Sequence, residues 1–343
     1  MTDFLVAALQ ITSTSNVEAN FAEAEEQIEL ASRRGSELIG LPENFAFLGE
    51  DNEKLRMASE LSTKCTNFLK TMSQRYQVFL LGGGYPVPAG DDRHTFNRSA
   101  LFGKDGQVLA KYDKIHLFDV DLPDGNLYKE SSTILSGEEH PPVIDVPGLC
   151  KIGLSICYDV RFPELYRHLS SKGAELIMIP AAFTAFTGKD HWQILLQARA
   201  IENTAYVVAP AQTGIHYGRR QSHGHAMVID PWRTVLSDDC FTKDNDLALM
   251  NGVQALVRLL IEQAKLDKDN GLLTNGYVSG YPGSPLGTLD LELGRAKKHL
   301  DKYNIVFQPA VNEELAATAA WGTQMLGLYD KPVIDGVFSM WYG

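Results

Sequence analysis

Short apolar runs alternate with longer amphipathic stretches through the first two-thirds of the chain, and this alternation restricts the fold more than any other feature. Residues 4–9, 38–41 and 152–156 are examples of the runs. Each is long enough for a buried strand but too short for a buried helix. Between the runs, apolar residues recur at every third or fourth position, as they do on one face of a helix. Strands separated by helices predict an α/β fold in which helices cover a sheet.

The ends of the first helix and the position of one hairpin are also indicated by the sequence. Asn16 is a favourable N-cap, and Gly35 is a residue type that commonly ends a helix. Further along, the runs 99–102 and 108–112 flank a turn at 104–106, which predicts a hairpin. Because hairpins pair strands antiparallel and helical crossovers pair them parallel, we expect a mixed sheet.

Charge and hydropathy exclude several classes of partner. The chain has 343 residues, with 31 Lys and Arg against 43 Asp and Glu, so its formal net charge is −12. Nucleic-acid backbones and anionic membrane surfaces are bound through clustered Lys and Arg, so neither is an expected partner. No apolar run approaches the ~20 residues that span a bilayer. Asp3 stands where a secretory signal would be basic, so we expect a cytoplasmic protein.

The four cysteines do not form a metal-binding pattern. Cys65, Cys150, Cys157 and Cys240 include no CxxC pair and no Cys/His cluster with zinc-like spacing, so we expect no metal site. A reducing compartment also disfavours disulfides. Most buried cysteines act as small apolar side chains, and this is the interpretation for all of them except Cys157.

Three polar residues follow apolar runs directly, at positions where functional sites collect. Glu43, Lys114 and Cys157 each come at or just after the end of a predicted strand. Cys157 also precedes a helix expected near Phe162, whose dipole would favour a thiolate, and the N–H of Tyr158 could hydrogen-bond an oxyanion. Taken singly, each has an ordinary alternative: a structural cysteine, or a solvated charge at the rim of the fold. Spacing along the chain does not show that the three residues meet.

Three sequence blocks change this interpretation. Residues 41–44 (LPEN), 111–117 (KYDKIHL) and 157–164 (CYDVRFPE) resemble, in the same order, the signature blocks of the nitrilase (carbon–nitrogen hydrolase) superfamily. The resemblance covers about residues 4–236 and implies an α/β fold built as a four-layer α-β-β-α sandwich. Further matching stretches are 95–98, 187–192, 199–203 and 223–232.

The resemblance implies a role for each residue of a Glu–Lys–Cys site. Cys157 would be the nucleophile, Glu43 the general base and Lys114 the cation that faces the tetrahedral intermediate, while Glu130 would position Lys114 and the substrate. Lys114 would lower the pKa of the thiol, and Glu43 would take its proton. The amide would become a thioester and then a carboxylate, with loss of ammonia. Neither a metal nor a cofactor is required.

Within the superfamily, the blocks around Cys157 and at 187–192 look most like the amidase branch, whose nearest members act on deaminated glutathione. ω-Amidases and nitrilases are the alternatives. Such amidases take small carboxylate-bearing amides, so Arg161 could face a substrate carboxylate through a bidentate contact. A structural ion pair is an equally good interpretation of Arg161. The resemblance also implies a homodimer.

The last part of the chain resembles a different family. Residues 251–258, 278–287 and 307–318 resemble the N-terminal part of indolepyruvate ferredoxin oxidoreductase, a thiamine-diphosphate enzyme. Glu313 matches that family's glutamate at the cofactor's aminopyrimidine, but the phosphate- and magnesium-binding domain of the family is not present. We therefore expect an exposed carboxylate at Glu313, with no cofactor.

The sequence thus predicts two domains joined near Leu236. Residues 1–236 would form the carbon–nitrogen hydrolase domain without its last strand and C-terminal extension, and residues 237–343 would form a partial α/β segment. The leading hypothesis is an amidase. The alternatives are a fragment of a thiamine-diphosphate-dependent 2-oxoacid ferredoxin oxidoreductase and an inactive fusion of two incomplete proteins.

Overall fold

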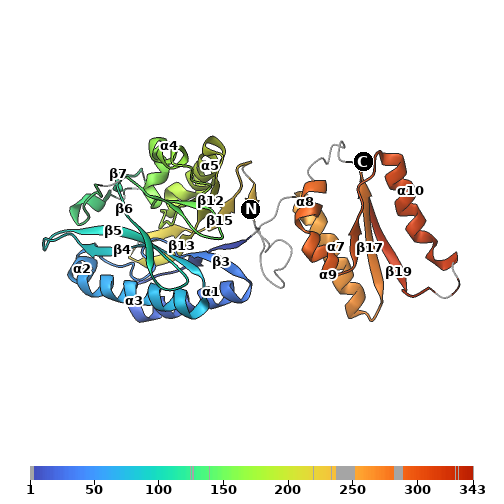
Figure 1. Cartoon of the computed structure of the whole chain (residues 1–343), viewed down its shortest axis with the longest axis horizontal. Helices are drawn as coiled ribbons and strands as arrows, with labels where there is room; N and C mark the ends of the chain where they lie inside the picture. The colour runs from blue at the N-terminus through green and yellow to red at the C-terminus, as the bar shows by residue number, and fades with distance from the viewer. Residues whose placement is uncertain are drawn as a thin grey trace. The chain divides into compact units, whose positions relative to one another are not determined.

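The chain divides into two compact units, Met1–Leu236 and Ser237–Gly343. The computed structural model describes residues 4–236, except 124, 126, 139, 219 and 233, and residues 252–342, except 282–288, 329 and 331. Each unit has its own hydrophobic core. Each unit also has its own sheets (Figure 1).

Two large mixed sheets form the centre of the first unit. The first sheet, in spatial order, consists of β1 (Leu5–Ala8), β3 (Ser36–Gly40), β4 (Phe79–Pro88), β5 (Thr95–Phe102) and β6 (Val108–Asp113). Its first three strands are parallel, and β4, β5 and β6 pair antiparallel. The second sheet consists of β16 (Val235–Leu236), β15 (Met227–Ile229), β12 (Tyr206–Ala209), β11 (Leu176–Met178), β10 (Lys151–Leu154) and β9 (Val143–Asp145). The mixed pairing expected from the sequence is confirmed.

Helices cover the outer face of each sheet, and short elements connect them. Figure 1 shows α1, α2 and α3 on one side of the unit and α4 and α5 on the other. The helices are α1 (Val17–Arg33), α2 (Asp51–Arg56), α3 (Ala58–Tyr76), α4 (Pro163–Ser171) and α5 (Ala185–Asn203). A smaller sheet consists of β14 (Arg220–His223), β13 (Ala211–Tyr217) and β2 (Gln10–Ile11), and β7 (Asp119–Asp121) pairs with β8 (Leu127–Lys129). The 3-10 helices are η1 (Glu130–Ser132) and η2 (Cys157–Arg161).

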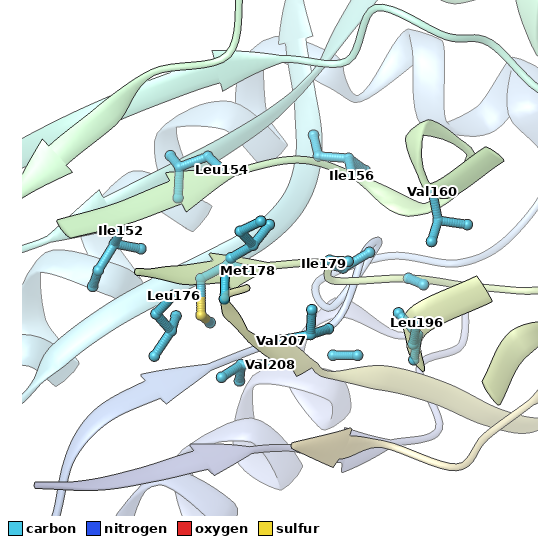
Figure 2. Packing of buried hydrophobic residues seen from close by; sticks show 14 of the residues in the cluster. Ile152, Leu154, Ile156, Val160, Leu176, Met178, Ile179, Leu196, Val207 and Val208 are labelled. Carbon is cyan, nitrogen blue, oxygen red and sulfur yellow. The ribbon is translucent and has the colours of Figure 1, made fainter. Parts of the chain in front are cut away.

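The two sheets pack face to face through apolar side chains. Leu38 and Leu81 of the first sheet share a cluster with Leu154, Met178 and Val207 of the second, and none of them is exposed. Figure 2 shows the packing on the second sheet. Together with the helices outside, this gives the layer order α-β-β-α that the resemblance implied.

A second cluster fills the space between the first sheet and its helices. Ile28 of α1 and Leu69 of α3 pack with Ile39 and Leu80 of the sheet. The side chain of Asn16 accepts a hydrogen bond from the N–H of Ala19, 3.1 Å away, which confirms the predicted N-cap. The predicted end of this helix at Gly35 is also confirmed, because Gly35 has a φ of 88°.

Two strands near Glu43 and Cys157 differ in length from the apolar runs that they contain. β4 extends beyond the apolar residues 78–81 and continues through three glycines to Pro88. Glycine is needed there because a Cβ on Gly83 would lie 2.0 Å from the carbonyl oxygen of Leu41 in the neighbouring chain segment. The strand predicted for 152–156 ends at Leu154, and η2 begins at Cys157. The strands β13 and β14 were not predicted, because their alternation of apolar and polar residues is weak.

The second unit is built on a parallel sheet of three strands. Their order is β18 (Ile305–Phe307), β17 (Thr274–Gly280) and β19 (Gly336–Tyr342). The helical elements are α7 (Gly252–Asp269), α8 (Leu289–Arg295), α9 (Lys297–Lys302), α10 (Glu313–Thr323) and the 3-10 helix η3 (Gln324–Leu328). β17 pairs with β19 from Thr274 opposite Gly336 to Gly280 opposite Tyr342.

Several predictions concern residues outside those described. They are the junction just after Leu236, where the last strand of the hydrolase domain was expected to be missing, and the structural role of Cys240. Residue 251 of the block 251–258 and residues 282–287 of the block 278–287 also lie outside the described residues. In the described segments, no helix combines the length and the apolar character that crossing a membrane would require.

Candidate active site

The structure brings together the four residues predicted to form the catalytic site. Glu43 follows β3, Lys114 follows β6, Cys157 follows β10 and Glu130 begins η1. The Nζ atom of Lys114 lies 3.1 Å from Oε1 of Glu43 and 2.9 and 2.8 Å from the two carboxylate oxygens of Glu130. A cation therefore lies between two carboxylates that are far apart in the sequence.

The backbone at Cys157 is strained in a way that its surroundings maintain. Its φ is 47°, a left-handed value that is uncommon for a residue with a side chain. The N–H of Cys157 donates to the carbonyl of Pro180 over 2.9 Å. Asp159, which is fully buried, accepts hydrogen bonds from the N–H of Ile156 and the hydroxyl of Tyr112, at 2.9 and 2.8 Å. These contacts fix the turn that presents the thiol.

The carboxylate of Glu43 is held by donors on every side. It accepts from Nδ2 of Asn97 at 2.9 Å, from Nζ of Lys114 at 3.1 Å and from the N–H of Ala182 at 2.9 Å. The Cys157 thiol also hydrogen-bonds to it. Glu43 is only 3% exposed, so its orientation is set by these four contacts.

The pKa of Glu43 is lowered despite its burial. Burial alone would raise the pKa of this carboxyl, but the positive charge of Lys114 and the hydrogen bonds from Cys157, Ala182 and Lys114 outweigh burial. The net shift is below the ordinary value of 4.5. Glu43 is therefore ionised near neutral pH and can accept a proton.

The pKa of Lys114 is raised. Burial would lower it, but the charges of Glu130 and Glu43 act in the opposite direction and dominate. Lys114 therefore stays positively charged. Its two carboxylate neighbours keep it from acting as the base.

The net pKa of the Cys157 thiol is raised, although the helix dipole and Lys114 were predicted to favour the thiolate. Lys114 does lower the pKa of Cys157, but burial and the negative charge of Glu43 raise it well above 9.0. The predicted helix dipole does not act here either, because Cys157 opens a short 3-10 helix and α4 begins only at Pro163. The resting sulfur therefore keeps its proton and hydrogen-bonds to an ionised carboxylate.

The catalytic candidates open into a cavity of about 220 Å³. Phe118, Tyr158 and Phe183 form aromatic parts of its wall, and the rings of Phe118 and Tyr158 are 5.0 Å apart. Such a volume admits a small organic molecule. Its wall also includes four charged residues beyond the catalytic set, which are Asp51, Lys54, Lys129 and Arg220.

Arg161 does not line this cavity. Its guanidinium carbon lies 5.8 Å from the ring centre of Tyr158 and 5.4 Å from that of Phe183, and its NH2 group contacts Nδ1 of His191 at 3.2 Å. Arg161 thus supports the aromatic wall from outside. The prediction that it faces a substrate carboxylate has no contact to support it, and no ion pair of Arg161 occurs in the described residues either.

Sequence reasoning missed several residues that shape the site. Asn97 lies in the stretch 95–98, which was singled out, but its hydrogen bond to Glu43 gave no local signal. Lys54 on α2 and Arg220 on β14 looked like ordinary surface cations. Within the described ranges, no group of three or more His, Cys, Asp or Glu side chains is arranged to hold a metal ion.

Glu313 lies in the other unit. It is the first residue of α10, is partly exposed, and its carbonyl accepts a hydrogen bond from the indole of Trp341 over 3.1 Å. Glu43, Lys114 and Cys157 all belong to the first unit.

Comparison with known proteins gives one family and several close relatives. The model of the carbon-nitrogen hydrolase family matches residues 5–245. A Synechocystis sp. protein named deaminated glutathione amidase is 59% identical over 239 residues, which cover 69% of this chain and 88% of that protein. The crystal structure of Caenorhabditis elegans NitFhit has a TM-score of 0.63 at 41% identity, covering 67% of this chain and 56% of that one.

A third similar structure concerns the cysteine directly. It is a mutant amidase from Nesterenkonia sp. AN1, with a TM-score of 0.59, 25% identity, and coverage of 67% of this chain and 84% of that one. Its active-site cysteine carries the acetamide moiety of fluoroacetamide as a covalent adduct.

Proposed function

The chain belongs to the carbon–nitrogen hydrolase family and is an amidase, and we propose that its substrate is a small carboxylate-bearing amide such as deaminated glutathione. The observation that carries the proposal is the buried contact of Glu43 with both Lys114 and the Cys157 thiol at the wall of a small cavity. The name of the Synechocystis relative supports the choice of substrate.

Attack on the amide begins from the neutral thiol. As the sulfur of Cys157 bonds to the carbonyl carbon, its proton moves along the existing hydrogen bond to the Glu43 carboxylate. The carbonyl π electrons become a lone pair on oxygen, which is stabilised by Lys114 and the N–H of Tyr158. One preorganised donor of this kind contributes about 3–4 kcal/mol in a dry site.

Collapse of the tetrahedral intermediate releases the nitrogen. Glu43 returns the proton to the leaving nitrogen, the C–N bond breaks, and ammonia or an amine departs while Cys157 holds the acyl group as a thioester. Glu43, ionised again, takes a proton from a water that attacks the thioester carbon. The C–S bond then breaks, the carboxylate product leaves and the thiol regains a proton.

Glu130 acts through Lys114 and is a positioning residue. Both of its carboxylate oxygens contact the Nζ atom of Lys114, and Oε2 also accepts from the N–H of Phe118 at 2.6 Å. The ammonium is thereby held in one orientation between Glu43 and Glu130. This arrangement stabilises developing oxygen charge without a costly reorganisation during the reaction.

The proposed mechanism is tested by the covalent intermediate. Mixing the protein with substrate should give a whole-protein mass increase equal to the acyl group, located on Cys157 by peptide mapping. C157A should show neither the adduct nor turnover. C150A is the matched control, because Cys150 is a half-buried cysteine outside the cavity, and it should retain both. Turnover by C157A would contradict the mechanism.

Other substrates of the same superfamily remain alternatives to be compared directly. They are an ω-amide of a keto acid, a nitrile and a carbamoyl compound. Assays of these three compounds beside deaminated glutathione should give the highest kcat/KM for deaminated glutathione. A higher value for another compound would reassign the substrate without changing the site.

We also propose that the second unit derives from the N-terminal part of an indolepyruvate ferredoxin oxidoreductase, joined near Leu236. Its parallel sheet with helical cover is compatible with that origin. We expect no working thiamine-diphosphate site in this unit. Glu313 is partly exposed, and the described residues include no cluster of metal ligands for the magnesium ion of a diphosphate. Titration calorimetry with thiamine diphosphate and magnesium should give no binding heat, and a saturable signal would favour the oxidoreductase alternative.

A homodimer in the cytoplasm is the proposed state of the protein. Phe186, Ile194 and Ile201 are exposed on α5 at a spacing that places them near one face, which is compatible with a subunit contact. The described cysteines are free thiols, as a reducing compartment requires. Sedimentation of a monomer alone at micromolar concentration would contradict the dimer.

A further inference from the structure

One side of the cavity carries positive charge that the mechanism does not use. Beyond Glu43, Lys114 and Glu130, the cavity is lined by three cations and a single carboxylate. The cations are Lys54, Lys129 and Arg220, and the carboxylate is Asp51. The chain as a whole has a formal charge of −12, so this local excess of cations is not a consequence of composition.

Arg220 is incompletely satisfied. Its NH2 group donates to the carbonyl of Ala182 over a long 3.3 Å, and its Nε atom is buried with no hydrogen bond among the described residues. Among the described residues, no carboxylate forms an ion pair with Arg220. The guanidinium lies 4.7 Å from the ring centre of Tyr128, which holds its plane without neutralising its charge. A buried, unpaired guanidinium N–H is unfavourable unless a ligand accepts from it.

Lys54 supplies a second, partly compensated cation. Its side chain is only 10% exposed, and its Nζ atom lies 3.5 Å from Asp51 and 3.4 Å from the side-chain oxygen of Asn44. Both contacts are long for a charged donor. Asp51 is 52% exposed, so solvent screens its charge and leaves Lys54 able to attract a further anion.

The separation between Arg220 and the carboxylate of Glu43 is limited by one residue, Ala182. The N–H of Ala182 donates to Glu43 at 2.9 Å, and its carbonyl accepts from Arg220 at 3.3 Å. With ordinary covalent geometry inside Ala182, the carboxylate of Glu43 and the guanidinium lie within about 10 Å of each other. A short, linear molecule with an amide at one end and a carboxylate at the other can therefore place the amide beside Glu43 and the carboxylate beside Arg220.

We propose that Arg220, assisted by Lys54, forms a carboxylate-binding subsite that selects amides bearing an anionic group a few carbons from the scissile carbonyl. This inference rests on the proposed amidase function and adds the residues that determine specificity. A guanidinium presents two parallel N–H donors to a carboxylate. The Nε–H of Arg220, which has no hydrogen bond among the described residues, would be one of these two donors. Arg161, outside the cavity, has no part in the subsite.

The test compares two amides of the same shape. Succinamate carries a carboxylate where 4-methylpentanamide carries an isopropyl group, so their ratio of kcat/KM measures recognition of the anion. R220M should lower kcat/KM for succinamate by about 10- to 100-fold and change that for the neutral amide less than about threefold. R220K should fall between wild type and R220M, because it keeps the charge and loses the paired donors.

R161M is the matched control, since it removes an arginine that contacts the same aromatic wall from outside. It should alter both rates in parallel and leave their ratio unchanged. Thermal unfolding of each variant separates a folding defect from a binding defect. An equal loss on both amides in R220M, or a changed ratio only in R161M, would overturn the proposal.

A binding measurement separates failure of the subsite from failure of the amidase assignment. Titration calorimetry of succinamate into C157A and into C157A/R220M requires no turnover. Weaker binding in the double variant, by about 10-fold or more, supports the subsite even if neither amide is hydrolysed. Equal affinity in the two variants would overturn it even if C157A has lost all activity.

Discussion

At the scale of single residues, the location of one proton explains the chemistry of the site. Cys157 and Glu43 share a hydrogen bond, and the surroundings place the proton on sulfur. Burial and the charge of Glu43 disfavour a thiolate at Cys157. Lys114 and the N–H of Ala182 favour the ionised carboxylate of Glu43. A protected thiol is less exposed to adventitious oxidation than a free thiolate, and it becomes reactive only as the substrate carbon approaches.

The pH dependence should reflect this proton location. The lowered pKa of Glu43 means that its base form is present above about pH 4.5 and is lost as the pH falls through its pKa. Cys157 has a pKa well above 9.0, so the resting thiol persists to that pH. A profile of kcat/KM from pH 4 to 10 should therefore be flat from about pH 5 to 9. An acidic or basic limb between pH 6 and 8 would contradict the assigned protonation states, provided that the fold remains intact.

Asn97 provides a second prediction at this scale. Its Nδ2 donates to the ionised Glu43, so N97A should raise the pKa of Glu43 and move the acidic limb to higher pH. We expect kcat/KM at neutral pH to fall about 5- to 10-fold, as for loss of one hydrogen bond.

S99A is the matched control for N97A. Ser99 lies on the same strand and makes a buried hydrogen bond of 2.9 Å to the carbonyl of Gly82, but it does not contact Glu43. It should lose stability with no shift of the acidic limb. Identical pH profiles for N97A and wild type would remove Asn97 from the positioning of the base.

At the scale of elements, the site depends on a close approach of two chain segments. β4 runs through Gly83 against the segment that leads from β3 into Glu43, and the ends of β6 and β10 reach the same place. Each strand end is rigid because it belongs to a sheet, and each functional side chain follows one directly.

This arrangement predicts a strong effect for the smallest possible substitution. In G83A the new Cβ would meet backbone atoms of Leu41 and Pro42 at 2.0 and 2.5 Å, which cannot move without displacing Glu43. We expect a loss of about 1–3 kcal/mol in the free energy of unfolding and a large fall in kcat. Chemical denaturation and steady-state kinetics measure the two effects.

G103A is the comparison for G83A. There the new Cβ would meet the end of the Asp105 side chain at 2.9 Å, a group that can rotate away. G103A should keep its kcat and most of its stability. Full activity in G83A would show that the approach of β4 to the loop before Glu43 is not as tight as described.

At the scale of the whole molecule, the functional residues belong to one of two compact units. The first unit supplies the catalytic set and the cavity lining. The second has a separate core, in which Val257, Ile261 and Leu293 of its helices are buried. Hydrolysis is therefore expected to depend on the first unit.

The separation of the cores gives a prediction. I261D places a charge where the side chain is fully buried, so it should unfold the second unit and remove its transition from a calorimetric scan. The kcat/KM for succinamate should stay within about twofold of wild type. A parallel loss of activity would show that the first unit needs the second, and V108D, at an exposed position of the first unit, controls for the added charge.

The sequence by itself determined much of this protein. Apolar periodicity located most strands and helices. A half-buried strand repeats its apolar side chains about every two residues, and a half-buried helix repeats them about every 3.6 residues. The ordered blocks around Glu43, Lys114 and Cys157 identified the family, since the chemistry admits few replacements at these positions. The second unit's family resemblance stays a prediction.

Tertiary structure alone decided the rest. The protonation of Cys157 depends on charges and burial contributed by Glu43 and Lys114, which lie 114 and 43 residues earlier in the sequence. Asn97, Ala182 and Arg220 gained their roles only by meeting other segments across the two sheets. Electric fields and hydrogen bonds act over a few ångströms of space, whatever the distance along the chain, and local sequence patterns carry no record of those contacts.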